Sequence, residues 1–228
     1  MSTLLLDLRH ALRAVSRQPV GFAAAVISIS LGLGAASVLF GVVDALLLRP
    51  PAHVRAPVEI IRLYYSRTSA VNVSPLTSFP TYELLRARLT ALPQLAAQAS
   101  KTLVVGRGAE AREVSAEFVS ANSFSILGVT PAIGRFFIED EDRAISSPSV
   151  VLGHGFWRGA FGGSPNVLGQ TIAIGNRTLT VVGVAPARFN GIDQARIDVW
   201  LPIGAASAFV APQALTSPTL YWVIGVSP

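Results

Sequence analysis

The most prominent hydrophobic pattern is a long apolar segment near the N-terminus, from Val20 to Leu48, with no charged residue between Val20 and Val43. About 20 helical residues cross the hydrocarbon core of a bilayer, and a span in lipid must satisfy its own backbone hydrogen bonds. The segment therefore predicts a transmembrane helix. A buried helix of a soluble protein is usually shorter and has a polar face, and the apolar region of a signal peptide is typically about 7 to 15 residues long, so both alternatives fit less well.

The predicted helix is longer than a bilayer requires. At about 1.5 Å per residue the segment would measure about 43 Å, against a hydrocarbon core of roughly 30 Å. We expect its far end to continue as a helical stalk that stops at Pro50 and Pro51, so that residues 19–49 form the transmembrane helix and stalk.

Small residues recur along this helix in two stripes. The first recurs at every fourth residue, and the second lies on another side: Ala24, Ser28, Gly32 and Ala36, then Ser30, Gly34, Ser37 and Gly41. Small residues let helix backbones approach closely in a membrane, although Gly and Ala are also simply tolerated there. A lone anchor that faces only lipid has no need of two such stripes. We therefore predict that Ala24, Ser28, Gly32 and Ala36 pack against further transmembrane helices.

Residues 1–18, before the span, have the pattern of an amphipathic helix that lies in the membrane interface, because leucines recur there at helical spacing. Arg9, Arg13 and Arg17 favour a cytoplasmic N-terminus by the positive-inside rule. Arginines also follow the span, but large domains translocate despite such charge, so the prediction holds.

After a proline-bounded linker at residues 50–57, the pattern predicts a mixture of strands and helices. Helices are expected from Ser78 to about Leu92, over 120–127 and over 154–161, whereas 66–77 is polar and turn-rich. Gly175 and Asn176 predict the turn of a hairpin. Strands are expected over 59–65, 94–105, 110–119, 147–152, 170–174, 178–184, 198–202 and 220–226. This order indicates an α+β fold with helices on one face of a sheet.

Composition changes this picture little. The net charge of +5 comes from scattered arginines and one lysine, without a basic run interleaved with aromatic residues, which argues against nucleic-acid binding. Basic residues beside a membrane are more simply explained by anionic lipid. The chain contains no cysteine, which excludes disulfides and thiolate metal sites.

Candidate chemistry is weak, and we predict no enzyme activity, cofactor or metal site. Gly153 and Gly155 follow a predicted strand, but their spacing does not match a dinucleotide-binding loop, and no P-loop motif occurs. His154, at the start of the next predicted helix, is better explained by a structural hydrogen bond than by catalysis. The acidic run 139–142 lacks the pattern of a calcium loop and is expected to be a solvated turn.

The order of motifs resembles the MacB/FtsX-like ABC-transporter permease family, in its N-terminal half with the periplasmic core domain, and looks closest to the large permeases of the acidobacterial type. The similarity runs through almost the whole chain. The residues that carry it are Asp7–Arg13, Ser78–Tyr82, Val119–Arg135, Val151–Trp157, Phe161–Ile172 and Val181–Pro186.

This resemblance implies one transmembrane helix followed by a two-lobed periplasmic α+β domain. A porter-like lobe would cover 58–135 and an inserted distal lobe 136–219, and a strand at 220–228 would return to the porter-like lobe. In the family, three further transmembrane helices and a dimerising ATPase complete the transporter, so the chain corresponds to a truncated or split permease.

The resemblance also implies a permease of an ABC exporter in the bacterial inner membrane, which couples a cytoplasmic ATPase to periplasmic movement for export or efflux. The implied partners are an ABC ATPase subunit or domain, further transmembrane helices, the lipid bilayer and periplasmic proteins. The alternative is a membrane-anchored periplasmic interaction module without transport activity.

Overall fold

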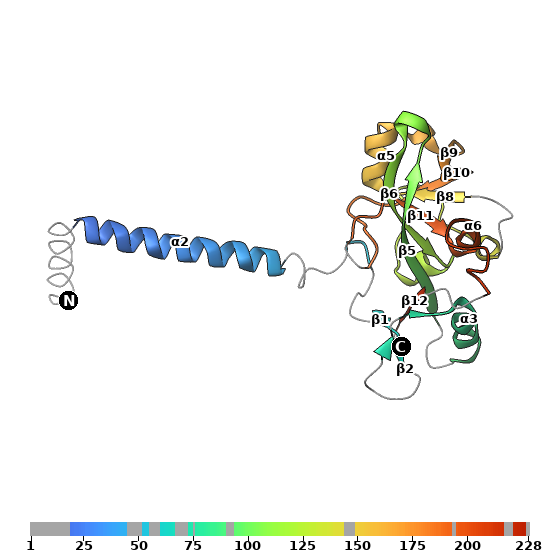
Figure 1. Cartoon of the computed structure of the whole chain (residues 1–228), viewed down its shortest axis with the longest axis horizontal. Coiled ribbons are helices and arrows are strands. Elements are labelled where there is room, and N and C mark those ends of the chain that lie inside the picture. Colours follow the sequence, from blue (N-terminus) through green and yellow to red (C-terminus); the bar gives the residue numbers. More distant parts are fainter. Residues whose placement is uncertain are drawn as a thin grey trace. The chain divides into compact units, whose positions relative to one another are not determined.

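The computed structural model of the protein describes residues 19–44, 52–54, 60–66, 73–74, 76–89, 94–143, 149–192, 195–216 and 221–226. The chain divides into two compact units, Met1–Arg49 and Pro50–Pro228 (Figure 1). The predicted interfacial helix at residues 1–18 lies outside the described residues, as do the end of the predicted stalk and most of the proline-bounded linker.

Unit 1 contains the predicted apolar helix as α2 (Pro19–Val43). It is long and apolar enough to cross a membrane, and none of its residues is buried within the protein. Pro19 begins the helix, where its missing N–H costs no helical hydrogen bond. A helix that is apolar all round and uncovered needs lipid or other helices around it.

Six strands of unit 2 form a closed ring. Around the ring these are β5 (Leu95–Val105), β6 (Arg112–Val119), β11 (Val199–Pro202), β8 (Ser149–Leu152), β10 (Arg177–Val184) and β9 (Thr171–Ile174). The β6–β11 and β8–β10 pairs are parallel, and the others are antiparallel. The ring closes where Val105 pairs with Ile174, and the amides of Gly106 and Gly175 donate to the carbonyls of Ala173 and Val104.

The same sheet extends past β5. There β12 (Tyr221–Val226) pairs with β5, with β1 (Ile60–Arg62) and with β4 (Leu76–Thr77), while β7 (Ile133–Gly134) pairs with β10. The prediction of one strand over 59–65 is wrong, because β1 pairs with β12 whereas β2 (Tyr65–Ser66) pairs with β3 (Val73–Ser74) in a separate sheet. The segment 66–77, for which the sequence pattern predicts a polar, turn-rich stretch and no strand, contains β3 and β4.

Alternation along the ring strands separates two hydrophobic clusters, because successive side chains of a strand point to opposite faces. In β11, Val199 and Leu201 belong to the cluster inside the ring, and Trp200 belongs to the cluster outside it. The outer cluster is rich in aromatic rings, including Phe124, Phe137 and Phe189.

The helices of unit 2 follow the predicted order. They are α3 (Phe79–Arg88), α4 (Ser123–Ile126), α5 (His154–Phe161) and α6 (Ala206–Phe209), the last of which the pattern does not predict. The 3₁₀ turns are η3 (Gly108–Glu110), η4 (Glu139–Asp142), η5 (Pro165–Val167) and η6 (Ile203–Ala205). Ser78 caps α3 by accepting from the amide of Thr81, as its position predicts. In Figure 1, α5 lies at one end of β5 and α3 near the other.

Strands from both predicted lobes share one sheet, since β6 of the first pairs with β11 of the second. The predicted returning strand, β12, pairs with β5 and β1 of the first lobe. The division at residue 136 stays a prediction.

Candidate functional site

The predicted helix-packing residues lie together on α2. Ala24, Ser28, Gly32 and Ala36 are all exposed in the structure. A Cβ added at Gly32 would meet nothing within 4 Å, and the same holds at Gly34 on the second stripe. The surface is therefore open and available, and its use in packing against further helices stays a prediction.

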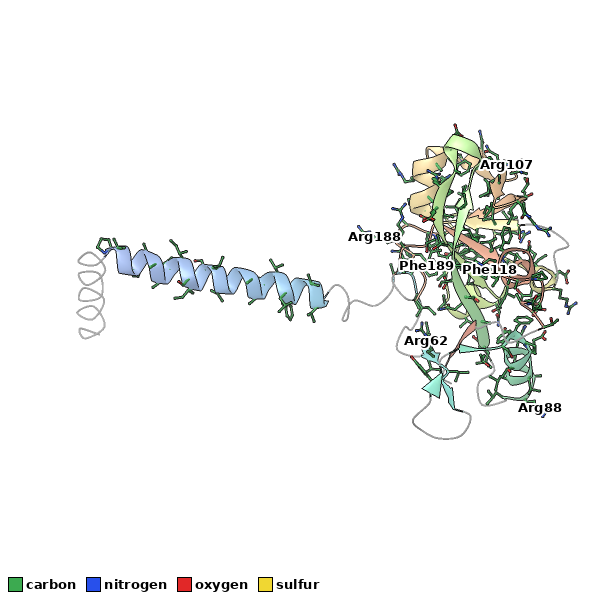
Figure 2. The ribbon with its side chains drawn as sticks, viewed as in Figure 1. Arg62, Arg88, Arg107, Phe118, Arg188 and Phe189 are labelled. Atoms are coloured by element: carbon green, nitrogen blue, oxygen red, sulfur yellow. The ribbon has the colours of Figure 1, made fainter. Side chains whose placement is uncertain are left out.

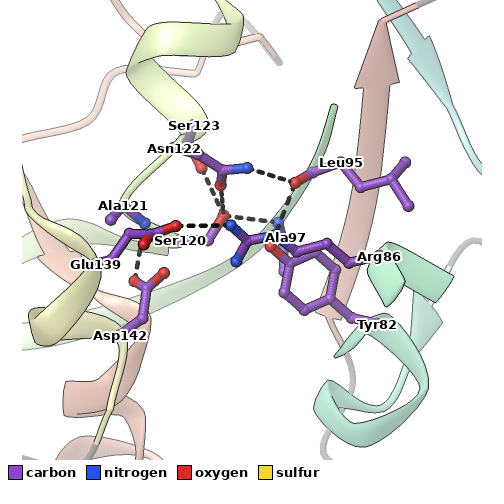
Figure 3. A network of polar contacts seen from close by, with 10 residues as sticks. All are labelled: Tyr82, Arg86, Leu95, Ala97, Ser120, Ala121, Asn122, Ser123, Glu139 and Asp142. Atoms are coloured by element: carbon purple, nitrogen blue, oxygen red, sulfur yellow. Dashed lines mark hydrogen bonds and ion pairs between the residues drawn. The ribbon is translucent and has the colours of Figure 1, made fainter. Parts of the chain in front are cut away.

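A polar junction lies where α3, β5, η4 and the corner between β6 and α4 meet (Figure 3). We call it the η4 junction. Ser120, at the corner, accepts the amide of Ala97 at 3.1 Å, and the side chain of Asn122 donates to the carbonyl of Leu95 at 2.7 Å. Tyr82 of α3 donates to the same carbonyl at 3.3 Å. The junction thus ties α3 and the α4 corner to the start of β5.

Two carboxylates of η4 complete the η4 junction. Asp142 accepts the amide of Ala121 at 2.8 Å, and Glu139 pairs with Arg86 of α3 at 2.9 Å. Burial raises the pKa of Asp142 from 3.8 to about 6; the Ala121 hydrogen bond and the charge of Arg86 lower it, whereas Glu139 and Glu141 raise it. Burial also raises the pKa of the Tyr82 hydroxyl.

The acidic run is not wholly the solvated turn that the sequence predicts, because Glu141 is buried. Its carboxylate accepts two hydrogen bonds from Arg135, at 3.0 and 3.1 Å, and one from the amide of Ile138 at 2.8 Å. Burial by itself would raise the pKa of Glu141, but these hydrogen bonds hold it below its usual value. The reason for the difference is that η4 packs beneath Gly204, where an added Cβ would meet the Glu141 carbonyl at 2.5 Å.

The loop that begins α5 is built for packing. A Cβ at Gly153 would collide with the carbonyl of Ile197, and the Gly153 amide donates to the Asp198 carbonyl at 2.8 Å. His154 lies edge-on against Trp157, with ring centroids 5.3 Å apart. Within the described residues, no group of three histidines and carboxylates could hold a metal ion.

A buried carboxylate outside the η4 junction escaped the sequence reasoning. Glu117 of β6 is 3% exposed and accepts the indole N–H of Trp200 at 3.1 Å. Glu117 lies on the outer face of the ring, beside the aromatic cluster. The sequence does not single it out, because the same strand carries a second glutamate, Glu113, which is exposed.

Comparison with known proteins decides the family. Residues 22–225 match the model of the MacB-like periplasmic core domain. The chain belongs to this family.

Relatives of this MacB-like chain are export proteins. It is 34% identical over 131 residues to a probable export ATP-binding/permease protein of Pseudomonas fluorescens (strain Pf0-1), and the match covers 54% of this chain and 20% of the relative. It is 46% identical over 57 residues to the macrolide export ATP-binding/permease protein MacB of Nitrosomonas europaea, which covers 25% of this chain and 8% of the relative. The chain thus spans about a fifth of the length of the first relative.

Solved structures show the same fold for the MacB-like chain. The periplasmic region of MacB from Actinobacillus actinomycetemcomitans has a TM-score of 0.57 at 15% identity, with 77% of each chain covered. The extracellular domain of the noncanonic ABC-type transporter YknZ from Gram-positive bacteria has a TM-score of 0.55 at 14% identity, covering 74% of this chain and 83% of that one.

The expected α+β fold after one N-terminal apolar helix is therefore confirmed. The helix and the MacB-like domain together indicate membrane anchoring with a periplasmic domain. The family is one of transporter permeases, which are not themselves enzymes, although the named relatives combine a permease with an ATP-binding part.

Proposed function

We propose that this chain is the permease subunit, or the N-terminal part of one, of a MacB-type ABC transporter. It couples a cytoplasmic ATPase to a conformational change of the periplasmic domain for export or efflux. The observation that carries this is the extent of the family match, which starts within α2 at residue 22 and runs to residue 225. The apolar helix and the domain thus belong to one family unit.

The finer parts of the proposal concern partners and orientation. The ATPase would be a separate subunit or domain, and further transmembrane helices of the same or another permease half would pack on Ala24, Ser28, Gly32 and Ala36. The N-terminus would be cytoplasmic and the domain periplasmic. Two of the relatives are ATP-binding/permease proteins, which supports the ATPase partner.

The alternative is a membrane-anchored module that binds periplasmic proteins without transport. Within the described residues a single helix qualifies as a membrane span, which is what such a module requires.

Pull-down from crosslinked membranes discriminates between the two. We expect a tagged full chain to capture an ABC ATPase subunit together with other helical membrane proteins. Capture of periplasmic proteins alone would favour the interaction module. A variant with Gly32→Leu and Gly34→Leu serves as the control, because it should reach the membrane and lose the captured helices.

Orientation is tested separately with protease protection in spheroplasts. A tag at the C-terminus should be digested from outside, and a tag at the N-terminus should be protected. The reverse pattern would contradict the proposed function.

A further inference from the structure

One interval of β5 has a partner strand on only one of its two edges. On one edge, β6 pairs with β5 from Gln98 to Val105. On the opposite edge, β12 pairs with residues 95–98 and β9 pairs with Val105. Between them, among the described residues, no strand pairs with residues 99–103 on that edge. We call residues 99–103 the β5 gap. In Figure 2 it lies along β5 between Phe118, whose Cα pairs with that of Ala99, and Arg107, in the turn that follows β5.

The hydrogen bonds of β5 show which backbone groups face the β5 gap. The carbonyl of Ala97 accepts the amide of Ser120, which directly follows β6, and the carbonyl of Val104 accepts an amide from the turn after β9, on the opposite edge. Backbone groups of successive strand residues point to alternate edges, so the even-numbered residues of β5 face away from β6. Ser100 and Thr102 therefore direct their N–H and C=O groups into the gap. Within the described part of the chain, no other strand bonds to these groups.

The β5 gap is open to solvent. Ser100, Lys101 and Thr102 are exposed, whereas Gln98 before the gap and Leu103 at its end are buried. An exposed strand edge is a template on which an extended peptide can form main-chain hydrogen bonds. Because β12 and β9 border the gap at its two ends, an added segment can be only a few residues long and cannot propagate a longer ladder.

A buried amide next to the gap lacks a hydrogen-bond partner. Gln98 is 4% exposed, and its Nε2 atom makes no hydrogen bond. It lies two residues before Ser100 and on the same face of β5, because side chains alternate along a strand. A buried donor without an acceptor costs free energy, which an acceptor on a segment bound in the gap would recover.

Lys101 gives the gap a preference for negative charge. It is the only lysine of the chain, and it is exposed at the centre of the gap. Its Cα pairs with that of Ala116, and it belongs to none of the ion pairs among the described residues. A lysine on a strand edge discourages apolar strands. The residue directly opposite it on an added strand has its side chain on the same face, so a carboxylate there would pair with Lys101.

We propose that the β5 gap binds a short extended segment of another protein, with an acidic residue opposite Lys101 and a hydrogen-bond acceptor beside Gln98. Main-chain hydrogen bonds to Ser100 and Thr102 hold the segment in place. The outer strands of a second copy do not supply it, because β1, β4 and β7 contain no acidic residue. That the partner is periplasmic rests on the proposed function, whereas binding at the gap does not.

The test uses the full chain in detergent micelles and two synthetic peptides, acetyl-Val-Thr-Glu-Thr-Val-amide and the same peptide with lysine in place of glutamate. Both read the same in either direction, so a parallel and an antiparallel pairing each place the central residue opposite Lys101. We expect the glutamate peptide to slow hydrogen exchange of the Ser100 and Thr102 amides several-fold, because these amides then donate to the peptide. The Lys101 and Leu103 amides face β6 and should keep their exchange rates. The lysine peptide should leave all four amides unchanged.

Variants separate the charge from the backbone contacts. Lys101→Glu should exchange the preferences, so that the lysine peptide slows exchange at Ser100 and Thr102 and the glutamate peptide does not. Arg88→Glu is the matched control, because it reverses the charge of an exposed arginine on α3 (Figure 2) and should leave the preference unchanged. Thr102→Pro removes an N–H that faces the gap and no ladder bond to β6, so it should weaken binding of the glutamate peptide several-fold. If Thr102→Pro does not fold, the Lys101→Glu comparison still decides.

Unchanged exchange with the glutamate peptide overturns the proposal, as does equal slowing by both peptides or an unchanged preference in Lys101→Glu. Slow exchange of Ser100 and Thr102 without any peptide would show that the chain itself fills the gap. Slowing that grows with protein concentration would show that a second copy fills it, and either result also overturns the proposal. None of these measurements involves an ATPase or the orientation of the domain, so their failure leaves the proposed function standing.

Discussion

Neighbouring carboxylates of one short acidic run have opposite electrostatic environments. Glu141 is buried but receives three hydrogen bonds, so it is held as a carboxylate with a lowered pKa. Burial, with smaller contributions from the charges of Glu139 and Glu141, raises the pKa of Asp142 to about 6, although this carboxylate accepts the backbone amide of Ala121. The hydrogen bonds that each carboxylate receives, and not its place in a run of like charges, decide whether its charged form stabilises the fold.

Asp142→Asn is expected to stabilise the protein at neutral pH. Because the pKa of Asp142 is higher in the folded chain than its ordinary 3.8, its contribution to stability is fully present below about pH 3.8 and is lost as the pH rises through about 6. The variant should be about 1 to 2 kcal/mol more stable at pH 7.5, after allowance for solvent screening, and equal near pH 4.

Thermal unfolding of the full chain in detergent between pH 4 and 7.5 measures this difference. Asp140→Asn, two residues earlier and exposed, is the control and should follow the original chain at every pH. A destabilised Asp142→Asn at pH 7.5 would contradict the expectation.

Arg135→Ala should be clearly destabilising, because it leaves the buried carboxylate of Glu141 without its cation. Glu141 is 3% exposed in its side chain, so we expect a loss of about 1 to 3 kcal/mol. Arg196→Ala removes a pair whose arginine is 73% exposed and should cost less than about 1 kcal/mol. Denaturant unfolding compares the two, and equal losses would refute the distinction.

At the scale of elements, close backbone approaches hold the ring to its neighbours. An added Cβ at Gly183 of β10 would collide with the carbonyl of Arg135, which follows β7. The same approach is secured by the Arg135 amide, which donates to the Val182 carbonyl at 2.9 Å. Gly183 is therefore a packing requirement of the β7–β10 pair.

Gly183→Ala is predicted to destabilise the protein by about 1 to 3 kcal/mol, since β7 must move away. Gly159→Ala is the matched control, because Gly159 is exposed on α5 and an added Cβ meets nothing within 4 Å. It should be neutral, or stabilising by up to about 1 kcal/mol through better helix propensity. Comparing the unfolding midpoints tests both variants. An unchanged midpoint for Gly183→Ala would show that β7 can shift away from β10 with little loss of stability.

Local patterns predicted most elements of the domain. The cap at Ser78, the turn at Gly175 and the apolar run of α2 each carry their signal within a few residues. The ring closure, the contact between His53 and the Ala187 carbonyl, and the contact between Glu117 and Trp200 depend on pairs far apart in the chain. The two-residue strands β3 and β4 form because they pair with β2 and β12. Their own turn-like composition therefore does not predict them as strands.

At the scale of the whole molecule, α2 and the domain make different demands on their surroundings. The domain buries its own two clusters, whereas α2 leaves side chains such as Leu31, 74% exposed, uncovered. The exposed apolar side chains of α2 are therefore covered only in a bilayer, and the small-residue stripes favour packing against other helices there.

Gly32→Leu should weaken association with other membrane helices, because added bulk keeps backbones apart. Leu33→Phe enlarges a side chain that belongs to neither small stripe and lies about 100° around the helix from Gly32, so it should leave the association unchanged. Crosslinking in native membranes measures both. Equal crosslinking of Gly32→Leu and the original chain would show that the stripe faces lipid.

The closed ring affects how the domain behaves at high protein concentration, where exposed strand edges can pair between molecules. Among the described residues every strand of the ring has a neighbouring strand on both sides, and the outer strands of the same sheet, β1, β4 and β7, are only two or three residues long. Copies of the domain can therefore be held at high density beside one another without templating intermolecular β-aggregates.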